Sequence, residues 1–372
     1  MRTLGIVVAT LLATSVSGAF AGPPGPPGPT NTFTVDCNRR QTISDAIARG
    51  DERKPLVVNI RGTCNEFVTI KRENVTLHGD PTAAINAPNT DADVIFVGAN
   101  GVTLENLTLT GGYYGVRVNG TFRTIVSNCV IQDTRMDGVR VFAGDVRVSN
   151  STIQRAGESG AYLTRGGSLG ASGSQFLDNA SSGIYATGNS TVSSSGSTFS
   201  RNVTGVLLET GSEGTFSGTT ISGNSGVGIT VASSQANVGG DNVITNNGIW
   251  GVRVYSGSMA TIYGNTIADN GADGVNGYLG TTIVMNDNQI SGNSGFGIEC
   301  TMNCTMELNT QTLENNAAGG IVVAQGTKLM LIGTIHSTGS GWGLQCDDKE
   351  SSVGNVGLLD GTVSDTCTDF DH

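Results

Sequence analysis

Apolar residues recur along the chain with a period of 22 or 23 residues. The marker of the period is a glycine followed by alternating apolar positions, as in Gly115, Val116 and Val118. The eleven marker glycines are Gly115, Gly138, Gly160, Gly183, Gly205, Gly228, Gly251, Gly274, Gly297, Gly320 and Gly343. Because alternation at period two is the pattern of a strand with one buried side, each glycine predicts the start of a short strand.

Each repeat carries two further apolar segments. One lies seven residues before most glycines, at Ile131, Ile153, Phe176, Ile221, Ile244, Ile267, Ile290 and Leu313. The other follows the glycine-led strand, at Val146, Val148, Val192, Phe216, Val238, Ile262, Ile283 and Leu331. Three apolar segments per repeat predict three short strands, which form one triangular coil of a single-stranded parallel β-helix. A leucine-rich repeat has a similar period, but leucine is sparse and its unit has one strand rather than three.

Asparagines and small hydroxyl residues follow the same period. One column lies four residues before its glycines, at Asn179, Asn224, Asn247, Asn270, Asn293 and Asn316. A second column lies two residues before the apolar residue, at Ser151, Ser174, Ser197, Thr219, Asn242, Asn265 and Asn288. Stacked amides hydrogen-bond along a column and to turn backbone, so we interpret these residues as structural ladders. A sugar site lined by amides is the alternative.

The two ends of the repeat array differ from its middle. Residues 41–50, QTISDAIARG, predict a short capping helix in which Thr42 and Asp45 begin the helix and Ile43, Ala46 and Ile47 line one side. Residues 56–77 predict three strands, and irregular coils continue to about residue 113. We therefore expect an N-terminal cap with irregular coils at 33–113, regular coils at 114–345, and a partial coil with an acidic tail at 346–372.

The N-terminal 21 residues read as a secretory signal peptide. Arg2 provides the positive start, an apolar run follows, and Ala19 to Ala21 forms an A-x-A cleavage site. A membrane anchor is the weaker alternative, because the run is too short to span and no later run is apolar enough. Residues 22–32, which include GPPGPPGP, predict a stiff spacer. We expect a secreted or periplasmic protein, cleaved near Ala21.

Composition and charge limit the classes of binding partner that suit this chain. The chain of 372 residues has 55 glycines, only 14% charged residues and a net charge of −11. An acidic chain of this kind is unsuited to nucleic acid and to anionic membrane surfaces.

Seven cysteines in an exported chain predict disulfides. Candidate pairs are Cys37 with Cys64, Cys300 with Cys304 and Cys346 with Cys367, with Cys300 to Cys346 as an alternative. Cys129 is then single and buried. No histidine lies near a cysteine pair, so we expect neither a metal nor a cofactor.

Outward positions on the glycine-led strands are where we expect function, because inward positions fill the core. The first cluster of candidates holds Tyr114, Arg117, Asp137, Arg140, Phe142, Glu158 and Tyr162. The second holds Trp250, Arg253, Tyr255, Asp273, Asn276 and Tyr278. Aromatic faces stack on sugar rings and arginines pair with carboxylates, so these clusters predict binding of an acidic polysaccharide. Asp137, Glu158 and Arg140 are the candidate acid/base group, and solvated surface ion pairs are the alternative interpretation.

The helix TISDAIA, the following VVNIRGTCNEFVTI and the coils N-x-x-x-G-[IV]-x-V resemble proteins of the pectin-lyase-like superfamily. The resemblance covers about residues 33 to 365 and is closest to exported bacterial proteins known mainly by this repeat. It implies a right-handed parallel β-helix. The superfamily includes lyases, hydrolases, esterases, epimerases and adhesins, so the fold alone does not give the function.

No complete catalytic set of the superfamily transfers to this chain. RMDGV at 135–139 and GADGV at 271–275 are similar to one polygalacturonase motif, but the paired aspartates and the basic triplet do not follow. The R-x-P-x-x-R segment of pectate lyases and the D-P-H-D segment of alginate epimerases are absent from the sequence. Three functions therefore remain: a polysaccharide-binding protein, a polysaccharide lyase, hydrolase or epimerase acting at the same strands, and a structural or adhesin-like rod.

Overall fold

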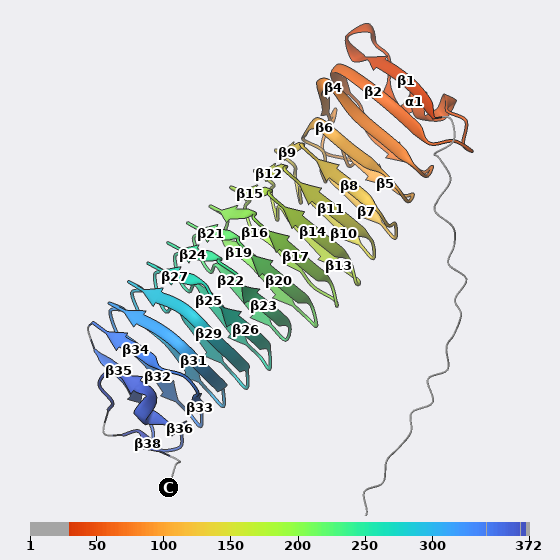
Figure 1. The fold of residues 1–372 in the computed structure, drawn as a ribbon. Helices are drawn as coiled ribbons and strands as arrows, with labels where there is room; N and C mark the ends of the chain where they lie inside the picture. The colour runs from red at the N-terminus through yellow and green to blue at the C-terminus, as the bar shows by residue number, and fades with distance from the viewer. Residues whose placement is uncertain (1–29, 340, 365, 370–372) are drawn as a thin grey trace, which may run out of the picture.

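The computed structural model describes residues 30–339, 341–364 and 366–369, and shows a rod of stacked coils (Figure 1). About 14 parallel turns follow one another, with the two ends of the described chain at opposite ends of the rod. The expected right-handed β-helix is therefore confirmed. The predicted signal peptide, most of the spacer and the last three residues lie outside the described residues. No helix that the structure describes is long and apolar enough to span a membrane.

Three strands per coil build three faces, as predicted. The glycine-led strands form face 1, a parallel sheet of thirteen strands. Its strands are β3 (Val68–Ile70), β5 (Ile95–Val97), β7 (Val116–Asn119), β10 (Val139–Phe142), β13 (Ala161–Thr164), β16 (Ser182–Ala186), β19 (Thr204–Glu209), β22 (Ile229–Ala232), β25 (Val252–Tyr255), β28 (Val275–Tyr278), β30 (Phe296–Thr301), β32 (Gly319–Ala324) and β35 (Trp342–Cys346).

The other two strands of each coil belong to one sheet of 25 strands, because some strands run around the corner between them. In the middle coils, face 2 is the strand that follows face 1, and face 3 is the next. The strands are β1 (Asn31–Asp36), β2 (Leu56–Asn65), β4 (Val75–Asn86), β6 (Thr103–Thr110), β8 (Thr124–Ser127), β9 (Val130–Gln132), β11 (Asp145–Ser149), β12 (Thr152–Gln154), β14 (Ser168–Ser172), β15 (Gln175–Leu177), β17 (Thr191–Ser195), β18 (Thr198–Ser200), β20 (Glu213–Ser217), β21 (Thr220–Ser222), β23 (Gln235–Gly239), β24 (Val243–Thr245), β26 (Met259–Tyr263), β27 (Thr266–Ala268), β29 (Thr282–Ser291), β31 (Thr305–Glu314), β33 (Lys328–Leu331), β34 (Ile335–Thr338), β36 (Ser352–Gly354), β37 (Leu359–Asp360) and β38 (Thr368–Asp369).

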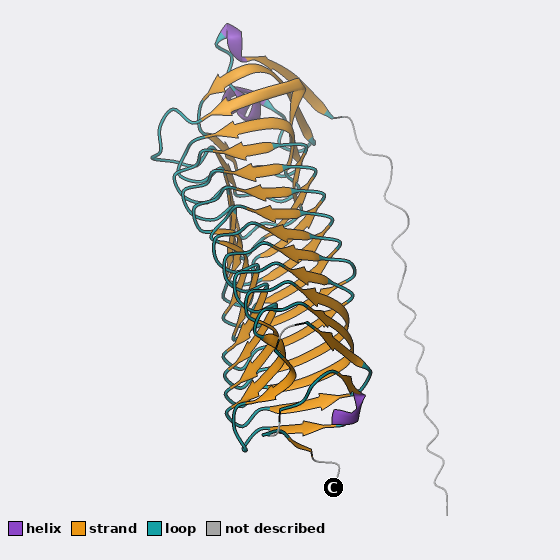
Figure 2. Cartoon of the chain, turned by 90° about the vertical axis from the view of Figure 1, so that its left-hand side faces the viewer, coloured by secondary structure: helices purple, strands orange, loops and turns teal. Residues whose placement is uncertain are grey.

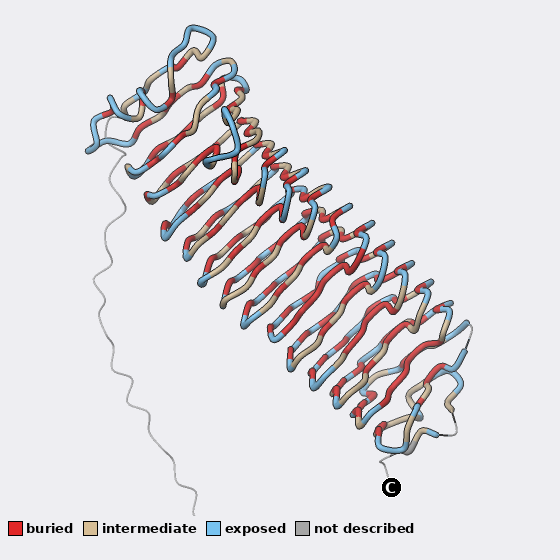
Figure 3. The backbone as a smooth tube through the Cα atoms, turned by 180° about the vertical axis from the view of Figure 1, so that it is seen from behind, coloured by how far each residue is buried: buried red, intermediate tan, exposed pale blue. Residues whose placement is uncertain are grey.

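The core is a continuous apolar column along the rod axis. Residues one repeat apart are paired in register, so Val116, Val139 and Ala161 stack on one another inside face 1. The stacked rings of Phe176 and Phe199, with centroids 5.0 Å apart, continue the column inside face 3. Buried segments alternate with exposed ones around every coil (Figure 3). Because each coil covers the apolar side of its neighbours, burial depends on stacking rather than on any single coil.

The repeated glycines allow neighbouring coils to approach closely. A Cβ atom added at any marker glycine from Gly115 to Gly320 would lie only 2.5–2.9 Å from the carbonyl oxygen of the next marker glycine. At Gly251, for example, it would lie 2.6 Å from the Gly274 oxygen and 2.7 Å from Ile267 Cγ2. The period of the glycines therefore reflects contact between backbones at the corner before face 1.

Polar ladders occupy the corners between the faces. Before face 1, each asparagine Nδ2 donates to the Oδ1 of the next asparagine at 2.9–3.2 Å. The residues of this ladder are Asn179, Asn202, Asn224, Asn247, Asn270, Asn293 and Asn316. Asn202 is an addition to the predicted column. The ladder between faces 2 and 3 holds the predicted residues from Ser151 to Asn288 and continues to Gln311. Both predicted ladders are thus confirmed.

A third ladder, which we did not predict, lies between faces 1 and 2. The backbone N–H groups of Ser190, Ser212 and Ser234 each donate to the hydroxyl of the next serine in the column, the last being Ser258. Thr281 follows in the same column, and its Oγ1 is buried without a partner among the described residues. Polar groups at all three corners thus satisfy most of the backbone that the turns leave unpaired.

The N-terminal coil is closed by a helix, as predicted. Helix α1 (Ile43–Arg49) buries Ile43 and Ala46, and its N-cap Thr42 accepts a hydrogen bond from the Asp45 N–H. The Glu66 carboxylate accepts hydrogen bonds from the Ile43 and Ser44 N–H groups, which places negative charge at the positive end of the helix. Figure 2 shows the helical segments only at the two ends of the rod. They are α1 and the 3₁₀ turns η1 (Cys37–Arg39) and η2 (Val356–Leu358).

Three disulfides join the cysteines in the predicted pairs. They are Cys37–Cys64, Cys300–Cys304 and Cys346–Cys367, and the alternative pair of Cys300 with Cys346 is not formed. Cys129 is single and buried, and burial raises the pKa of its thiol to about 11. The first and last bridges lie at the two ends of the rod, where coils have a neighbour on one side only.

Candidate functional site

The outward middle column of face 1 carries the predicted clusters. Strand register places its residues directly above one another in the order Phe96, Arg117, Arg140, Tyr162, Tyr185, Leu207, Thr230, Arg253, Asn276, Glu299, Val322 and Gln345. Unlike the corner ladders, this column changes its chemistry from coil to coil. Parallel strands are about 4.8 Å apart, so a ligand that follows the rod would meet each of these side chains in turn.

Arg140 is the centre of the first cluster, and its own neighbours occupy much of it. Its guanidinium lies 3.6 Å from the ring centroid of Tyr162, 4.8 Å from that of Phe142 and 5.4 Å from that of Tyr114. Its Nη1 donates to Asp137 Oδ2 at 2.8 Å. The aromatic side chains therefore hold the arginine by cation–π contacts, which uses ring faces that we expected to stack on sugars.

Asp137 lies beneath this arginine with both carboxylate oxygens engaged. One oxygen accepts from Arg140 and the other from the Ser159 N–H of the next coil, and the residue is 1% exposed. Burial raises the pKa of Asp137, and the hydrogen bond from Arg140 opposes that rise. Glu158 lies in an exposed turn on the next coil. The three proposed acid/base residues thus lie near one another, but the aspartate has no oxygen facing solvent.

Arg117, one coil earlier, is also paired within the protein. Its Nη1 lies 3.4 Å from Asp93 Oδ2, and its guanidinium lies 4.9 Å from the ring centroid of Phe96. Burial raises the pKa of Asp93. We did not predict Asp93 or Phe96, because they precede the regular repeat and only strand register shows that they lie beside Arg117.

The second cluster differs because its arginine has no carboxylate partner. The Arg253 guanidinium lies between two rings, 4.2 Å from the centroid of Trp250 and 4.8 Å from that of Tyr255. No ion pair between Arg253 and a carboxylate occurs in the part of the chain that the structure describes. Its Nε–H is buried without an acceptor among these residues. The rings hold the guanidinium plane, and no described carboxylate forms an ion pair with it.

A network of carboxyl and amide groups lies next to Arg253. Asp273 accepts from the Trp250 Nε1–H at 3.1 Å, from the Phe296 N–H at 2.8 Å and from Asn276 Nδ2 at 3.3 Å. Asn276 Nδ2 also donates to Glu299 Oε2 at 2.8 Å, so it connects the two carboxyl groups. Asp273 and Asn276 are each 6% exposed, whereas Glu299 is half-buried.

Glu299 has the strongest perturbation of a carboxyl group on this face. Burial is the largest cause, followed by a hydrogen bond with Asp273 and by the negative charges of Asp273 and Asp347, and together they raise the pKa of Glu299 to about 7. Asp273 and Asn276 were predicted members of the cluster. Glu299 was not among the predicted members, since a sequence pattern does not show how deeply a carboxyl group is buried. Tyr278 pairs in register with Tyr255 at the edge of the cluster.

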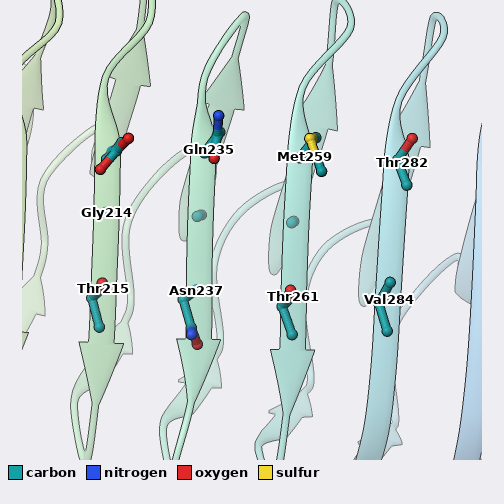
Figure 4. A pocket seen from close by; sticks show the side chains of 11 residues that line it. Gly214, Thr215, Gln235, Asn237, Met259, Thr261, Thr282 and Val284 are labelled. Carbon is teal, nitrogen blue, oxygen red and sulfur yellow. The ribbon is translucent and has the colours of Figure 1, made fainter. Parts of the chain in front are cut away.

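Face 2 has a shallow groove of about 270 Å³ that offers different chemistry. Figure 4 shows two rows of side chains on adjacent strands along this groove. One row holds Glu213, Gln235, Met259 and Thr282, and the other holds Thr215, Asn237, Thr261 and Val284. Glu213 is the one charged residue among them, so the groove offers mainly hydroxyl and amide groups for contacts.

Metal binding has little support among the described residues. The one group of potential ligands within reach of a shared ion is Cys37, Cys64 and Glu66. The two sulfur atoms form a disulfide and the Glu66 carboxylate caps helix α1, so the ligand atoms are already engaged.

Comparison with known proteins agrees with the fold. The family model of the right-handed β-helix region matches residues 92–239 and 204–351, which together are more than half of the chain. No curated protein matches the sequence significantly.

Solved structures with the same fold include three carbohydrate-active proteins. The catalytic domain of a GH87 α-1,3-glucanase gives a TM-score of 0.53 at 13% identity, over 81% of this chain and 67% of its own. A mutant of the periplasmic alginate epimerase AlgG gives 0.52 at 14%, over 91% and 84%. The A-module of the mannuronan C-5 epimerase AlgE4 from Azotobacter vinelandii gives 0.52 at 14%, over 82% and 92%. At such low identity these likenesses show the fold alone.

Proposed function

The chain belongs to the right-handed β-helix family, and we propose that it binds an acidic polysaccharide along face 1, with Arg253 as the main anion-binding group. The observation that carries this proposal is the Arg253 guanidinium, which is held between Trp250 and Tyr255 and has no ion-pair partner among the described residues. A guanidinium fixed in this way presents its N–H groups at little entropic cost when it meets a ligand carboxylate.

The other two arginines of the column support a division of roles. Arg117 and Arg140 are paired with Asp93 and Asp137, so their charges are largely satisfied within the protein. A ligand could displace neither aspartate without leaving a buried carboxylate unpaired, which is costly. We therefore place the charge contact at Arg253 and assign the first cluster to contacts along the remaining chain of the ligand, through the edges of Tyr114, Phe142 and Tyr162.

An extended polymer fits the arrangement better than a small molecule. The column runs over successive coils without interruption, so one ligand chain could contact several coils. The net charge of −11 opposes general attraction of polyanions. Binding must then depend on the placed guanidinium rather than on overall charge, which a single substitution tests.

The location that we propose is outside the cytoplasm. Three disulfides in one chain are typical of proteins that fold in an oxidising compartment, and the N-terminal sequence has the features of a secretory signal. Known relatives by fold include a periplasmic alginate epimerase and a glucanase, and these support a polysaccharide as the ligand class. Mass spectrometry of the mature protein would test cleavage near Ala21.

Titration calorimetry with oligomers of galacturonate, mannuronate and hyaluronan tests the binding proposal. Charge-assisted hydrogen bonds contribute about 1.5–3 kcal/mol, so Arg253→Ala is expected to weaken binding by at least about tenfold. Arg147→Ala is the matched control, because Arg147 is an exposed arginine on face 2 and the substitution changes the net charge equally.

Three results would contradict the proposal. The first is no binding of any of the three oligomers by the wild-type protein. The second is equal affinity of Arg253→Ala and the wild type. The third is an equal loss in Arg147→Ala, which would show attraction by overall charge rather than by a site on face 1. Arg253→Lys separates planar pairing from simple charge, since lysine keeps the charge and loses the paired N–H geometry.

A further inference from the structure

We propose that Glu299 and Asp273 form a proton-accepting part of the binding site, so that the protein takes up one proton together with its anionic ligand. This inference rests on the proposed binding at Arg253 and adds a pH dependence to it. In its acid form Glu299 shares its proton with Asp273 and the pair carries one negative charge, whereas in its ionised form the pair carries two and would repel the bound carboxylate. The glycan is then bound below neutral pH and released above it.

The geometry places Glu299 where a ligand held by Arg253 would extend. Both residues point outward from face 1, with Asn276 between them in the same column. Asn276 Nδ2 holds Glu299 Oε2 at 2.8 Å. The acid proton of Glu299 is held in its hydrogen bond with Asp273, so Glu299 acts on a ligand beside it through its charge.

Asp273 is the more strongly hydrogen-bonded of the two carboxyl groups. Its oxygens already accept from the Trp250 indole, the Phe296 backbone and the Asn276 amide. Hydrogen bonds of this kind stabilise an ionised carboxylate, whereas Glu299 receives only one. Two carboxyl groups joined by one amide repel each other when both are ionised, so the one with fewer hydrogen bonds, Glu299, holds its proton to higher pH.

The surrounding charges favour the same assignment. On the strands next to Glu299, β28 offers Asn276 and Tyr278, and β32 offers Val322, so the charge beside it comes from Asp273. Asp347, which follows β35, adds a second negative charge from the far side. Arg253 lies on the other side of Asn276, two strands away. With these neighbours the pKa of Glu299 is about 7, so small changes of pH around neutrality alter its protonation.

The size of the effect follows from the fraction of protein in the acid form. With a pKa of about 7, the acid form decreases from roughly nine-tenths at pH 6 to one-tenth at pH 8. If only this form binds, the apparent Kd increases about tenfold over these two pH units. Uronate carboxyl groups remain ionised throughout, because simple carboxyl groups titrate near pH 4. Any change in this range therefore comes from the protein.

Calorimetry of the tightest-binding oligomer among those of galacturonate, mannuronate and hyaluronan tests the inference. Titrations at pH 6, 7 and 8, repeated in buffers with different ionisation enthalpies, give the affinity and the number of protons taken up. The wild type is expected to lose affinity about tenfold and to take up close to one proton at pH 8. Glu299→Gln is expected to bind with the same affinity at all three pH values, because the uncharged amide does not titrate.

Asp347→Asn is a second variant that leaves the hydrogen-bond network intact. It removes one negative charge near Glu299, so the pH of half-maximal affinity is expected to move to a lower value. Circular dichroism of each variant shows whether the fold is retained. A wild-type affinity that does not change with pH, or a Glu299→Gln variant with the wild-type pH dependence, overturns the inference and leaves binding at Arg253 standing. If none of the oligomers binds at any pH, the binding proposal itself is wrong.

Discussion

Replacing Asn247 by alanine is expected to cost several kcal/mol of stability, although the residue lies far from any end of the rod. Asn247 is 1% exposed in the middle of the asparagine ladder. Its Nδ2 donates to the Ile221 carbonyl at 3.2 Å and to Asn270 Oδ1 at 3.0 Å. Its Oδ1 accepts from the Asn224 backbone N–H at 3.2 Å and from Asn224 Nδ2 at 2.9 Å. Alanine at this position removes all four hydrogen bonds.

The magnitude follows from these contacts. A buried hydrogen bond contributes about 1 kcal/mol net, and a partner that stays buried and unsatisfied adds further cost. Four lost bonds therefore predict that the free energy of unfolding decreases by about 4 kcal/mol. The partners belong to the two coils on either side of Asn247, so the loss weakens two coil interfaces, on which the stability of a stacked repeat depends. An exposed substitution such as Thr261→Ala on face 2 is expected to change stability by less than about 0.5 kcal/mol.

Urea unfolding followed by circular dichroism measures both variants against the wild type. Equal slopes of the transitions would show that the same surface is exposed on unfolding, so midpoints can be compared directly. The ladder argument is refuted if Asn247→Ala and Thr261→Ala unfold within about 1 kcal/mol of each other. Asn247→Asp gives a further check, because an ionised carboxylate keeps the acceptor but loses both donors and adds a buried charge.

Two other predictions concern charge. Because the pKa of Glu299 is raised, the folded protein still holds a proton between about pH 4.5 and 7 that the unfolded chain has released. This group therefore contributes less to stability as pH rises through that range. The decrease in Tm from pH 5 to pH 8 should be smaller in Glu299→Gln than in the wild type, and an equal decrease would contradict this reasoning. At the corner before face 1, Arg155 pairs with Asp133 at 2.7 Å and lies one coil from Asp178. Arg155→Asp brings like charges together there, so its Tm should fall at low salt and recover at high salt, whereas a loss unaffected by salt would exclude charge repulsion as the cause.

The fold could be predicted from the sequence because each coil repeats the same requirements. A glycine in every repeat, as at Gly251, meets the backbone of the next coil, and alternating residues such as Val252 and Val254 fill the core. A repeated pattern gives many independent observations of one structural unit, so the three faces and two ladders were predictable. The third ladder was missed because serine is frequent throughout the chain and its spacing varies between Ser190 and Ser258.

Small irregularities in coil length explain the ladder residues that were missed. Asn202 lies three residues before Gly205 rather than four, because its coil has 22 residues between marker glycines. The strand register restores the alignment, and Asn202 hydrogen-bonds to Asn224 like every other member. Gln311 continues the other ladder with a longer side chain whose Oε1 reaches the same position as an asparagine Oδ1. Ladders thus follow geometry, and fixed spacing identifies only the members with regular coils.

The candidate site was less predictable because its chemistry depends on how side chains arrange within a column. The sequence places Trp250, Arg253 and Tyr255 near one another, but it does not show that both rings contact the guanidinium. Nor does it show that Asn276 joins Asp273 to Glu299, since these two carboxyl groups are 26 residues apart in the chain. Burial, which raises the pKa of Glu299, is a property of the stacked coils and has no signature in one repeat.

Under the proposed function, the uniform columns serve the structure and the variable outward column of face 1 serves recognition. A ladder works only if successive residues complement one another, so a change at one coil leaves two neighbours with unsatisfied groups. The outward column of face 1 is under no such constraint, and it is there that Arg253, Asn276 and Glu299 replace one another in successive coils. Arg253→Tyr, which places there the residue found in the same column at Tyr185, should therefore weaken binding far more than it lowers stability. A substitution within the asparagine ladder should lower stability far more than it weakens binding. A variant of Arg253 that unfolds as readily as Asn247→Ala would show that the two roles are not separate.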